Sequence, residues 1–159
     1  MQSQIIASKE ELYKELALSI RGLIDGEVNL VANLANITAL LKERLGHFWI
    51  GFYLVDDAEK QLVLGPFQGP LACTRIPFGR GVCGVCWKQK ASQVVPNVHE
   101  FPGHIACSTK TNSEIVVPVI NEQRVVAVLD IDSIELETFD EQDKAGLEHI
   151  CGVISKLNW

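Results

Sequence analysis

The chain has 159 residues with a formal net charge of −6, and 47% of its residues are hydrophobic while 21% are charged. This composition suits one globular domain and excludes a disordered polymer, and the 14 Lys and Arg residues form no run of the kind that binds nucleic acid or an anionic membrane surface. No segment reaches the roughly 18 apolar residues that span a bilayer.

The N-terminal sequence and the cysteine count indicate the compartment. The start of the chain lacks a cationic segment followed by an apolar one, so we read no signal peptide and expect a cytoplasmic protein. Five cysteines is an odd number, and thiols stay reduced in the cytoplasm. We therefore expect core cysteines or reactive thiols rather than a permanent disulfide framework.

Two amphipathic helices are predicted in the N-terminal part of the chain. Ser8 and Glu11 form a capping-box pattern, and apolar residues then recur at helical spacing from Leu12 to Leu23. A second apolar stripe runs from Val31 to Leu45 and ends at Gly46. These helices also offer a face for a homodimer.

Runs of β-branched and aromatic residues between turn-forming residues predict the strands. They cover residues 47–54, 61–64, 93–95, 114–120 and 124–131. The first two and the last two strands read as antiparallel hairpins, and Gly65 and Pro66 are expected to end the second strand. The polar loop from Pro96 to Ser113 is long, and long loops in compact domains are often functional.

Two further helices complete the predicted fold. A short amphipathic helix is expected over residues 82–89, and a final helix follows a capping-box pattern at Thr138 and Glu141, with an apolar stripe from Leu147 to Leu157. No linker or repeat divides the chain, so residues 1–159 are predicted to form a single domain. Helices at both ends around hairpin strands indicate an α+β fold, with a central antiparallel sheet flanked by the N- and C-terminal helices.

The segment Gly79–Gly84 reads GRGVCG and matches a dinucleotide-binding pattern. That pattern binds a dinucleotide only after a buried strand in a βαβ unit, and the irregular stretch around Pro77 does not provide one. We interpret the segment as a tight turn that opens a helix, whose N-terminus favours an anion.

Cys83 and Cys86 form a C-x-x-C pair, which is a redox couple or half of a zinc site in other proteins. Cys73, His104 and Cys107 are candidates for the remaining zinc ligands. No second C-x-x-C or H-x-x-x-H pattern exists, so we predict no metal site. Cys86 lies about one helical turn beyond Cys83 and is expected to point into the core.

Cys107 lies in the middle of the polar loop, in the segment GHIACST. His104 and Lys110 are close in sequence, and cationic neighbours lower the pKa of a thiol. The local sequence leaves a reactive thiol and a structural cysteine as alternatives.

Three acids stand at the ends of predicted strands: Glu114 before one, and Asp130 and Asp132 at the end of another. Residues two apart on a strand share a face, so both aspartates can point into one site. Close carboxylates do not ionise independently, and one of them is pushed toward its protonated form. The structural alternative is that these acids cap turns.

Five segments occur in a characteristic order: LGPFQG, IP-x-GRGVCG, GHIAC, NSEIVVP and VLDIDS. In this order they resemble the free methionine-(R)-sulfoxide reductases, which are built on a GAF domain. The resemblance covers the chain from about Trp49 to Asp143 and implies a GAF-like fold and the activity of an oxidoreductase without a cofactor.

The resemblance also implies roles for three cysteines. Cys107 becomes the nucleophile, which takes the substrate's oxygen as a sulfenic acid. Cys73 then resolves the sulfenic acid as a disulfide, and Cys83 is a second thiol of the site or an alternative resolving partner; the sequence leaves the choice between Cys73 and Cys83 open. Thioredoxin is the implied reductant of the disulfide.

The remaining implied site residues are the three acids and an aromatic pair, Trp49 and Tyr53, that forms the wall of the substrate pocket. Glu114 is expected to protonate the sulfoxide oxygen, with its proton held by the neighbouring aspartates. Asp130 or Asp132 would bind the ammonium group of the free amino acid.

This chain departs from the family pattern at two positions. Ser108 stands where the family commonly has Asp after the loop cysteine, and Cys86 is an additional thiol. The alternative hypotheses are a non-catalytic GAF module that binds a small molecule and a redox or metal sensor that uses the same cysteines.

Overall fold

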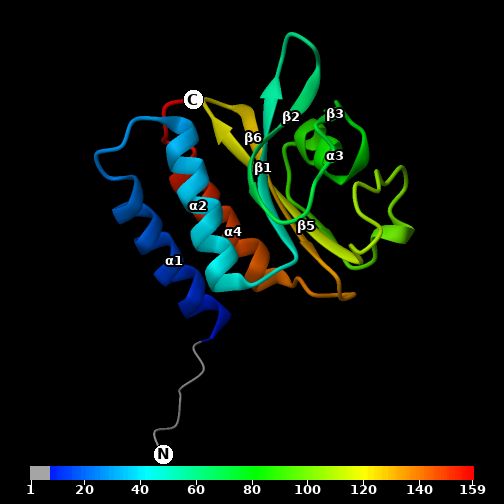
Figure 1. Ribbon diagram of the computed structural model, residues 1–159, viewed down its shortest axis with the longest axis horizontal. Helices are drawn as coiled ribbons and strands as arrows, with labels where there is room; N and C mark the ends of the chain where they lie inside the picture. Colours follow the sequence, from blue (N-terminus) through cyan, green and yellow to red (C-terminus); the bar gives the residue numbers. More distant parts are fainter. Residues whose placement is uncertain (1–7) are drawn as a thin grey trace, which may run out of the picture.

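The computed structural model describes residues 8–159, and Figure 1 shows their arrangement. Within this range there are four α-helices, six strands and one short 3-10 helix. The α-helices are α1 (Lys9–Ile24), α2 (Leu30–Leu45), α3 (Gly81–Gln89) and α4 (Glu141–Ile154). The strands are β1 (Trp49–Asp56), β2 (Gln61–Gln68), β3 (Arg75–Pro77), β4 (Gln93–Val95), β5 (Ser113–Asn121) and β6 (Arg124–Ser133), and the 3-10 helix η1 spans Val98–Glu100.

The strands form one sheet in the order β3-β2-β1-β6-β5-β4, and all its pairs within residues 8–159 are antiparallel. The predicted hairpins β1–β2 and β5–β6 are both confirmed. They meet at the centre of the sheet, where β1 pairs with β6. The α+β class with a central antiparallel sheet is therefore confirmed.

Helices lie on both faces of this sheet. Helices α2 and α4 pack on one face, and α1 lies outside them against α4 and α2 (Figure 1). The main core lies between these helices and the sheet, and includes the fully buried residues Ile37, Phe52, Leu129 and Ile150. Helix α3 and the loops around it cover the opposite face over a second apolar cluster.

Two of the three predicted helix caps are present in the structure, and the third is replaced by another residue. The capping box of Ser8 and Glu11 is confirmed, with both reciprocal bonds at 3.2 Å, and Gly46 ends α2 in the left-handed conformation with φ 70°. The capping box at Thr138 and Glu141 is wrong: Asp140 caps α4 and Asp143 returns the bond to its backbone.

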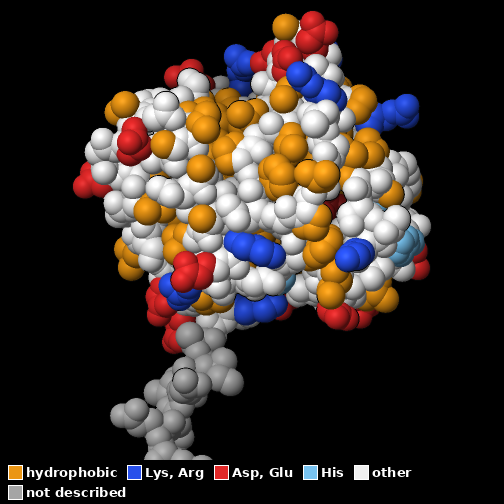
Figure 2. Space-filling model, viewed as in Figure 1, with side chains coloured by type: hydrophobic (Ala, Val, Ile, Leu, Met, Phe, Trp, Pro, Cys, Tyr) orange, Lys and Arg blue, Asp and Glu red, His pale blue; other side chains and the backbone are white. Residues whose placement is uncertain are grey.

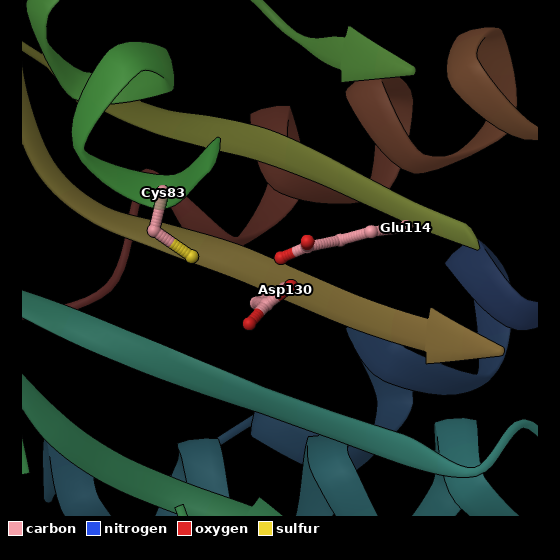
Figure 3. Close-up of side chains that lie close together, drawn as sticks. All are labelled: Cys83, Glu114 and Asp130. Atoms are coloured by element: carbon pink, nitrogen blue, oxygen red, sulfur yellow. The ribbon is translucent and has the colours of Figure 1, made fainter. Parts of the chain in front are cut away.

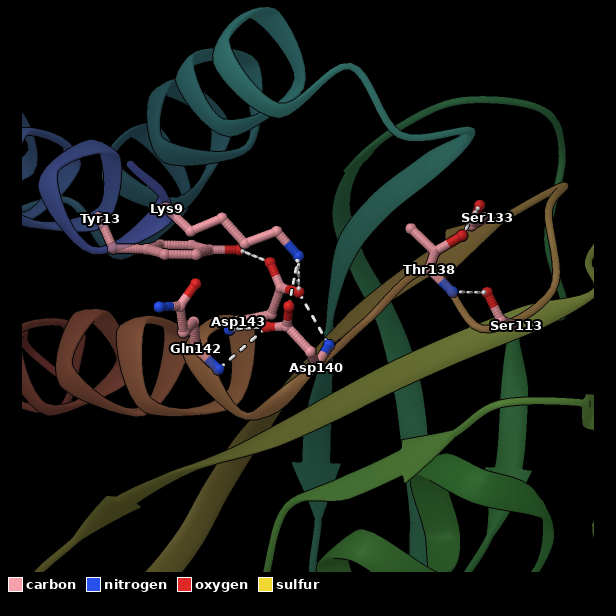
Figure 4. Close-up of polar contacts among 8 residues, drawn as sticks. All are labelled: Lys9, Tyr13, Ser113, Ser133, Thr138, Asp140, Gln142 and Asp143. Carbon is pink, nitrogen blue, oxygen red and sulfur yellow. Dashed lines mark hydrogen bonds and ion pairs between the residues drawn. The ribbon is translucent and has the colours of Figure 1, made fainter. Parts of the chain in front are cut away.

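The physical reason is that Thr138 is engaged elsewhere. Its hydroxyl group donates to Ser133 Oγ at 2.6 Å and its backbone N–H donates to Ser113 Oγ at 3.3 Å, which fixes the turn after β6 (Figure 4). The capping position therefore moves to Asp140, whose Oδ1 accepts from the backbone N–H groups of Gln142 and Asp143.

Asp143 also joins α1 to α4. Its buried carboxylate accepts hydrogen bonds from Tyr13 Oη at 2.7 Å and from Lys9 Nζ at 2.7 Å (Figure 4). Burial, followed by the bond to Asp143, raises the pKa of Tyr13, so the phenol stays protonated. The start of α1 is thus held on the start of α4 by charge-assisted hydrogen bonds.

Strand β2 is longer than predicted and continues through Gly65 and Pro66 to Gln68. The register between β1 and β2 shifts opposite these two residues, and a bulge of this kind accommodates a proline in a strand. Its outer neighbour β3, which was not predicted, pairs only with the first residues of β2. None of the helices in residues 8–159 is long and apolar enough to cross a membrane.

Candidate active site

The sheet itself aligns the predicted acids with the predicted aromatic wall. In the central strands Asp132 lies opposite Trp49 of β1 on one side and Glu114 of β5 on the other, and two residues earlier Asp130 lies opposite Gly51. Since residues two apart share a face, both rows project from the same side of the sheet. This is the side covered by α3.

A pocket opens between this face and the elements above it. Residues at the start of α3, the segment 70–72, and the loop between β4 and β5 close it from above. Seven of the eight predicted site residues line this pocket: Trp49, Tyr53, Cys83, Cys107, Glu114, Asp130 and Asp132. One cavity therefore joins the loop sulfur of Cys107 to the three acids.

The eighth predicted residue, Cys73, is joined to Cys107 by a disulfide bond, with the two Cα atoms 5.4 Å apart. These residues are 34 positions apart in the chain and come from two different loops. The predicted proximity of Cys73 and Cys107 is thus observed in the structure. The two residues are half-buried, so the bond lies at the mouth of the pocket rather than in the core.

The aromatic pair anchors the loop that carries Cys73. Tyr53 Oη donates to the carbonyl of Cys73 at 2.9 Å, and Trp49 Nε1 donates to the carbonyl of Pro70 at 3.0 Å. The two rings stack with their centroids 5.9 Å apart, and Phe67 stacks on the other side of Trp49 at 5.3 Å. These rings therefore form a rigid apolar wall and also position the loop that carries Cys73.

Two glycines make room for the indole of Trp49. A Cβ atom on Gly51 would lie 2.5 Å from Trp49 Cη2, and one on Gly69 would lie 2.6 Å from its Cδ1. Gly69 also has a φ of +145°, which other residues rarely adopt. The slot for Trp49 thus depends on the absence of side chains at two positions.

The acids share a dry environment. Glu114 and Asp130 are each 6% exposed, and burial raises the pKa of both carboxyl groups. The charges of Asp130 and Asp132 raise the pKa of Glu114 further, whereas the neighbouring side chains of Glu114 and Cys83 oppose the effect of burial on the pKa of Asp130. Burial and the charge of Asp130 also raise the pKa of Asp132 well above its ordinary value, so Glu114 and Asp132 both favour the protonated form.

The two cysteines of the C-x-x-C pair face different surroundings. Cys83 is 3% exposed and lines the pocket, and burial together with the nearby acids raises the pKa of its thiol. Cys86 is fully buried, and its Sγ lies 3.7 Å from the carbonyl oxygen of Val116. The core position predicted for Cys86 is confirmed.

The GRGVCG segment is a turn that opens α3. Gly79 and Gly81 have φ values of 73° and 62°, and the N–H of Gly79 donates to the carbonyl of Gly84 at 3.1 Å. A Cβ atom on Gly84 would lie 2.7 Å from the carbonyl oxygen of Pro77. These glycines serve tight backbone packing, and the antiparallel sheet of residues 8–159 offers no βαβ unit for a dinucleotide.

The sequence interpretation named His104 and Lys110 as cations near Cys107 and missed Thr111. His104 was expected to act on the Cys107 thiol, but its Nε2 lies 3.9 Å from Glu114 Oε2, and burial lowers its pKa, so it is mainly neutral at pH 7. Lys110, the other expected cation, is exposed and does not line the pocket. Thr111 lines the pocket and is 4% exposed, and no pattern in the polar loop pointed to it.

Several known proteins are similar to this chain in sequence and in structure. The GAF domain family model matches residues 29–157. The chain is 56% identical over 143 residues to GAF domain-containing protein A of Dictyostelium discoideum, covering 90% of each chain, and 46% identical over 156 residues to free methionine-R-sulfoxide reductase of Saccharomyces cerevisiae, covering 94% of this chain and 87% of the relative. It also resembles the structure of free methionine-R-sulfoxide reductase from Neisseria meningitidis in complex with its substrate, with a TM-score of 0.92 and 51% identity over 94% of this chain and 90% of that one.

Proposed function

Because this chain belongs to the free methionine-R-sulfoxide reductase family of GAF domain proteins, we propose that it reduces free methionine-(R)-sulfoxide to methionine with Cys107 as the nucleophile. The observation that carries the proposal is the Cys73–Cys107 disulfide at the mouth of a pocket whose floor holds the buried acids Glu114 and Asp130 and the half-buried Asp132. A non-catalytic ligand-binding module does not account for a disulfide in that position.

In the first step the thiolate of Cys107 attacks the sulfur of the sulfoxide. Glu114 donates its proton to the sulfoxide oxygen, which increases the electrophilic character of the sulfur. The oxygen ends on Cys107 as a sulfenic acid, and methionine leaves as a neutral thioether. The substrate sulfur is reduced by two electrons and the Cys107 sulfur is oxidised by two.

In the second step the thiol of Cys73 attacks the sulfenic sulfur of Cys107. The S–O bond breaks, water leaves, and the Cys73–Cys107 disulfide forms. A dithiol protein, for which we propose thioredoxin, then reduces the disulfide through a mixed disulfide and restores both thiols. Cys83 lies in the same pocket and offers a second thiol, so its share of the resolving step is open to direct measurement.

The pocket also accounts for a free amino acid as substrate. Asp130 or Asp132 would bind the ammonium group. Within the described residues Arg80 makes no side-chain cap at α3, so the backbone N–H groups at the start of α3, where Gly81 and Val82 line the pocket, are available to the carboxylate. Trp49 would pack on the S-methyl group, since a sulfur–aromatic contact contributes roughly 0.3–1.5 kcal/mol.

Stereospecific product analysis tests this proposal. The purified protein with dithiothreitol is expected to consume the R epimer of free methionine sulfoxide and to leave both the S epimer and N-acetylated, amidated methionine sulfoxide unchanged. Cys107→Ser is expected to abolish turnover. Cys151→Ser provides the matched control, since Cys151 is a buried thiol of α4 on the opposite face of the sheet.

Retained activity in Cys107→Ser would contradict the assigned nucleophile, and equal consumption of both epimers would contradict the proposed substrate. A coupled assay with thioredoxin, thioredoxin reductase and NADPH tests the reductant separately. The cytoplasmic location and the homodimer formed through the N-terminal helices stay predictions, to be checked by cell fractionation and by light scattering.

A further inference from the structure

Three potential ligand atoms converge in the pocket from three different elements. The Sγ of Cys83 on α3 and one carboxylate oxygen each of Glu114 on β5 and Asp130 on β6 all lie within 4.8 Å of one another. Figure 3 shows the three side chains pointing toward a common centre. All three residues are buried. A thiol and two carboxylates arranged in this way form a donor set that suits a thiophilic divalent cation.

A second observation concerns polar atoms that lack partners. Within residues 8–159, Asp130 Oδ1, Asp132 Oδ1 and Thr111 Oγ1 are buried without a hydrogen-bond partner, and their residues line the same pocket. In that part of the chain Glu114 has only His104 within ion-pair distance, and no Lys or Arg pairs with the acids. Burying such acceptors is unfavourable unless a donor or a cation satisfies them.

We propose that this cluster binds a cation of the Zn²⁺ class, with Cys83 as a thiolate and Glu114 and Asp130 as carboxylate ligands, and that the bound cation blocks the pocket. Zn²⁺ holds sulfur at about 2.3 Å and carboxylate oxygen at about 2.0–2.2 Å, which places tetrahedral donors about 3.5 Å apart. The observed spread requires shifts of about 1 Å, which side-chain rotation supplies. A water molecule completes the coordination.

This site differs from the zinc site that a C-x-x-C pair suggests. Cys86 contacts the carbonyl oxygen of Val116 and contributes no ligand. Burial keeps the thiol of Cys83 protonated when no cation is present, and a cation displaces that proton because only the thiolate is a strong ligand.

The oxidised protein isolates this site from the other thiols. The disulfide occupies Cys73 and Cys107, which would otherwise chelate a thiophilic ion. The described thiols that remain are Cys83, Cys86 and Cys151, and all three are buried. Of these, Cys83 alone lines the pocket. The binding experiment therefore starts from oxidised protein. A thiol titration of the unfolded protein should detect three free thiols, which shows that the disulfide is intact.

Cadmium is the probe, because a cadmium–thiolate bond has an ultraviolet charge-transfer band. The oxidised full-length chain is expected to bind one equivalent of Cd²⁺ with this band, and Cys83→Ala is expected to abolish it. Cys86→Ala and Cys151→Ala are the matched controls and are expected to retain it. Asp130→Asn, which keeps all three thiols, is expected to weaken binding by about tenfold or more.

The absence of the band in the oxidised wild type, or its persistence in Cys83→Ala, would overturn the proposal. Should Cys83→Ala fold poorly, the Asp130→Asn titration decides: unchanged affinity for cadmium in that variant contradicts the assigned ligand set. These titrations use oxidised protein, which does not catalyse the reaction. Their outcome is therefore independent of the proposed reductase activity.

The blocking effect, which rests on the proposed function, has its own test. Saturating free methionine sulfoxide is expected to weaken cadmium binding by about tenfold, whereas alanine at the same concentration controls for chelation of the cation by an amino acid. Equal affinities with methionine sulfoxide and alanine would show that the cation does not share the substrate pocket, even where the cadmium band confirms the binding site.

Discussion

Glu114→Gln is the substitution that separates chemistry from folding most cleanly. Glutamine has nearly the same shape as a protonated glutamate and retains a hydrogen-bond donor, but it cannot deliver a proton. Glu114 is 6% exposed, and burial and then the charges of Asp130 and Asp132 raise its pKa. The neutral side chain is therefore already the one that the folded protein accommodates.

The magnitude for turnover follows from the role of a general acid. Positioned proton transfer contributes about 10²–10⁴-fold, so the loss corresponds to about 2.7–5.4 kcal/mol of transition-state stabilisation. Activity of the wild type is also expected to decline as pH rises through the raised pKa of Glu114, because the proton is lost. The residual activity of Glu114→Gln is expected to lack that decline.

The expected effect on folding has the opposite sign. A carboxyl group whose pKa is raised in the folded state binds its proton more tightly there than in the unfolded chain. Its contribution to stability is complete below the unfolded pKa of about 4.3 and is lost as pH rises through the folded value. Glutamine does not ionise, so the Glu114→Gln variant does not lose stability in this way. The free energy of unfolding of the variant, relative to that of the wild type, is therefore expected to rise with pH.

The assay pairs turnover with urea unfolding from pH 4 to pH 9. Glu43→Gln is the matched control, since Glu43 is an exposed glutamate on α2 and is expected to change neither measurement. The reasoning is refuted if Glu114→Gln loses activity and stability in parallel at pH 8, because Glu114 would then have a structural role. Full activity in the variant would refute the assigned acid.

Three further variants test the elements around the pocket. Cys73→Ser is expected to leave the sulfenic acid unresolved, so that mass spectrometry after dimedone treatment detects the adduct in the variant and not in the wild type. Gly51→Ala forces a methyl group against the indole of Trp49, and overpacking of this kind is expected to destabilise by about 1–3 kcal/mol and to raise KM, as urea unfolding and kinetics will show. Tyr13→Phe removes the 2.7 Å bond to Asp143 and is expected to lower the free energy of unfolding by about 1.5–3 kcal/mol without changing KM.

The sequence predicted the elements whose signals are local and periodic. The stripe that ends at Gly46 is such a case, because the helical period and a glycine in the left-handed conformation both depend on nearby residues. The end of β2 is the opposite case. Gly65 and Pro66 are ordinary strand terminators, and only a bulge opposite β1 allows them to remain in the sheet. A bulge depends on the partner strand, and no local pattern reveals it.

The same distinction applies to the pocket. The spacing of Asp130 and Asp132 predicts a common face, but only the register of β5 against β6 places Glu114 opposite Asp132. The approach of His104 to Glu114 also depends on the fold, because closeness in sequence to Cys107 does not determine which carboxyl group its ring approaches. Thr111 lines the pocket because the loop between β4 and β5 folds over the acids, and no local sequence pattern predicts that path.

The proposed mechanism requires different properties of the sheet and of the loops. In the proposed mechanism Glu114 must retain its proton, and the paired central strands hold its carboxyl group in a buried, fixed position that favours the protonated form. In the same mechanism the thiol of Cys107 must react first with the substrate and then with the thiol of Cys73, and both residues lie on loops, which can move between two partners. Tyr53 links the two regions, because its ring forms part of the fixed wall while its hydroxyl group holds the carbonyl of Cys73. Removing that hydroxyl group should therefore slow disulfide formation more than the first chemical step, since only the position of the resolving thiol depends on it.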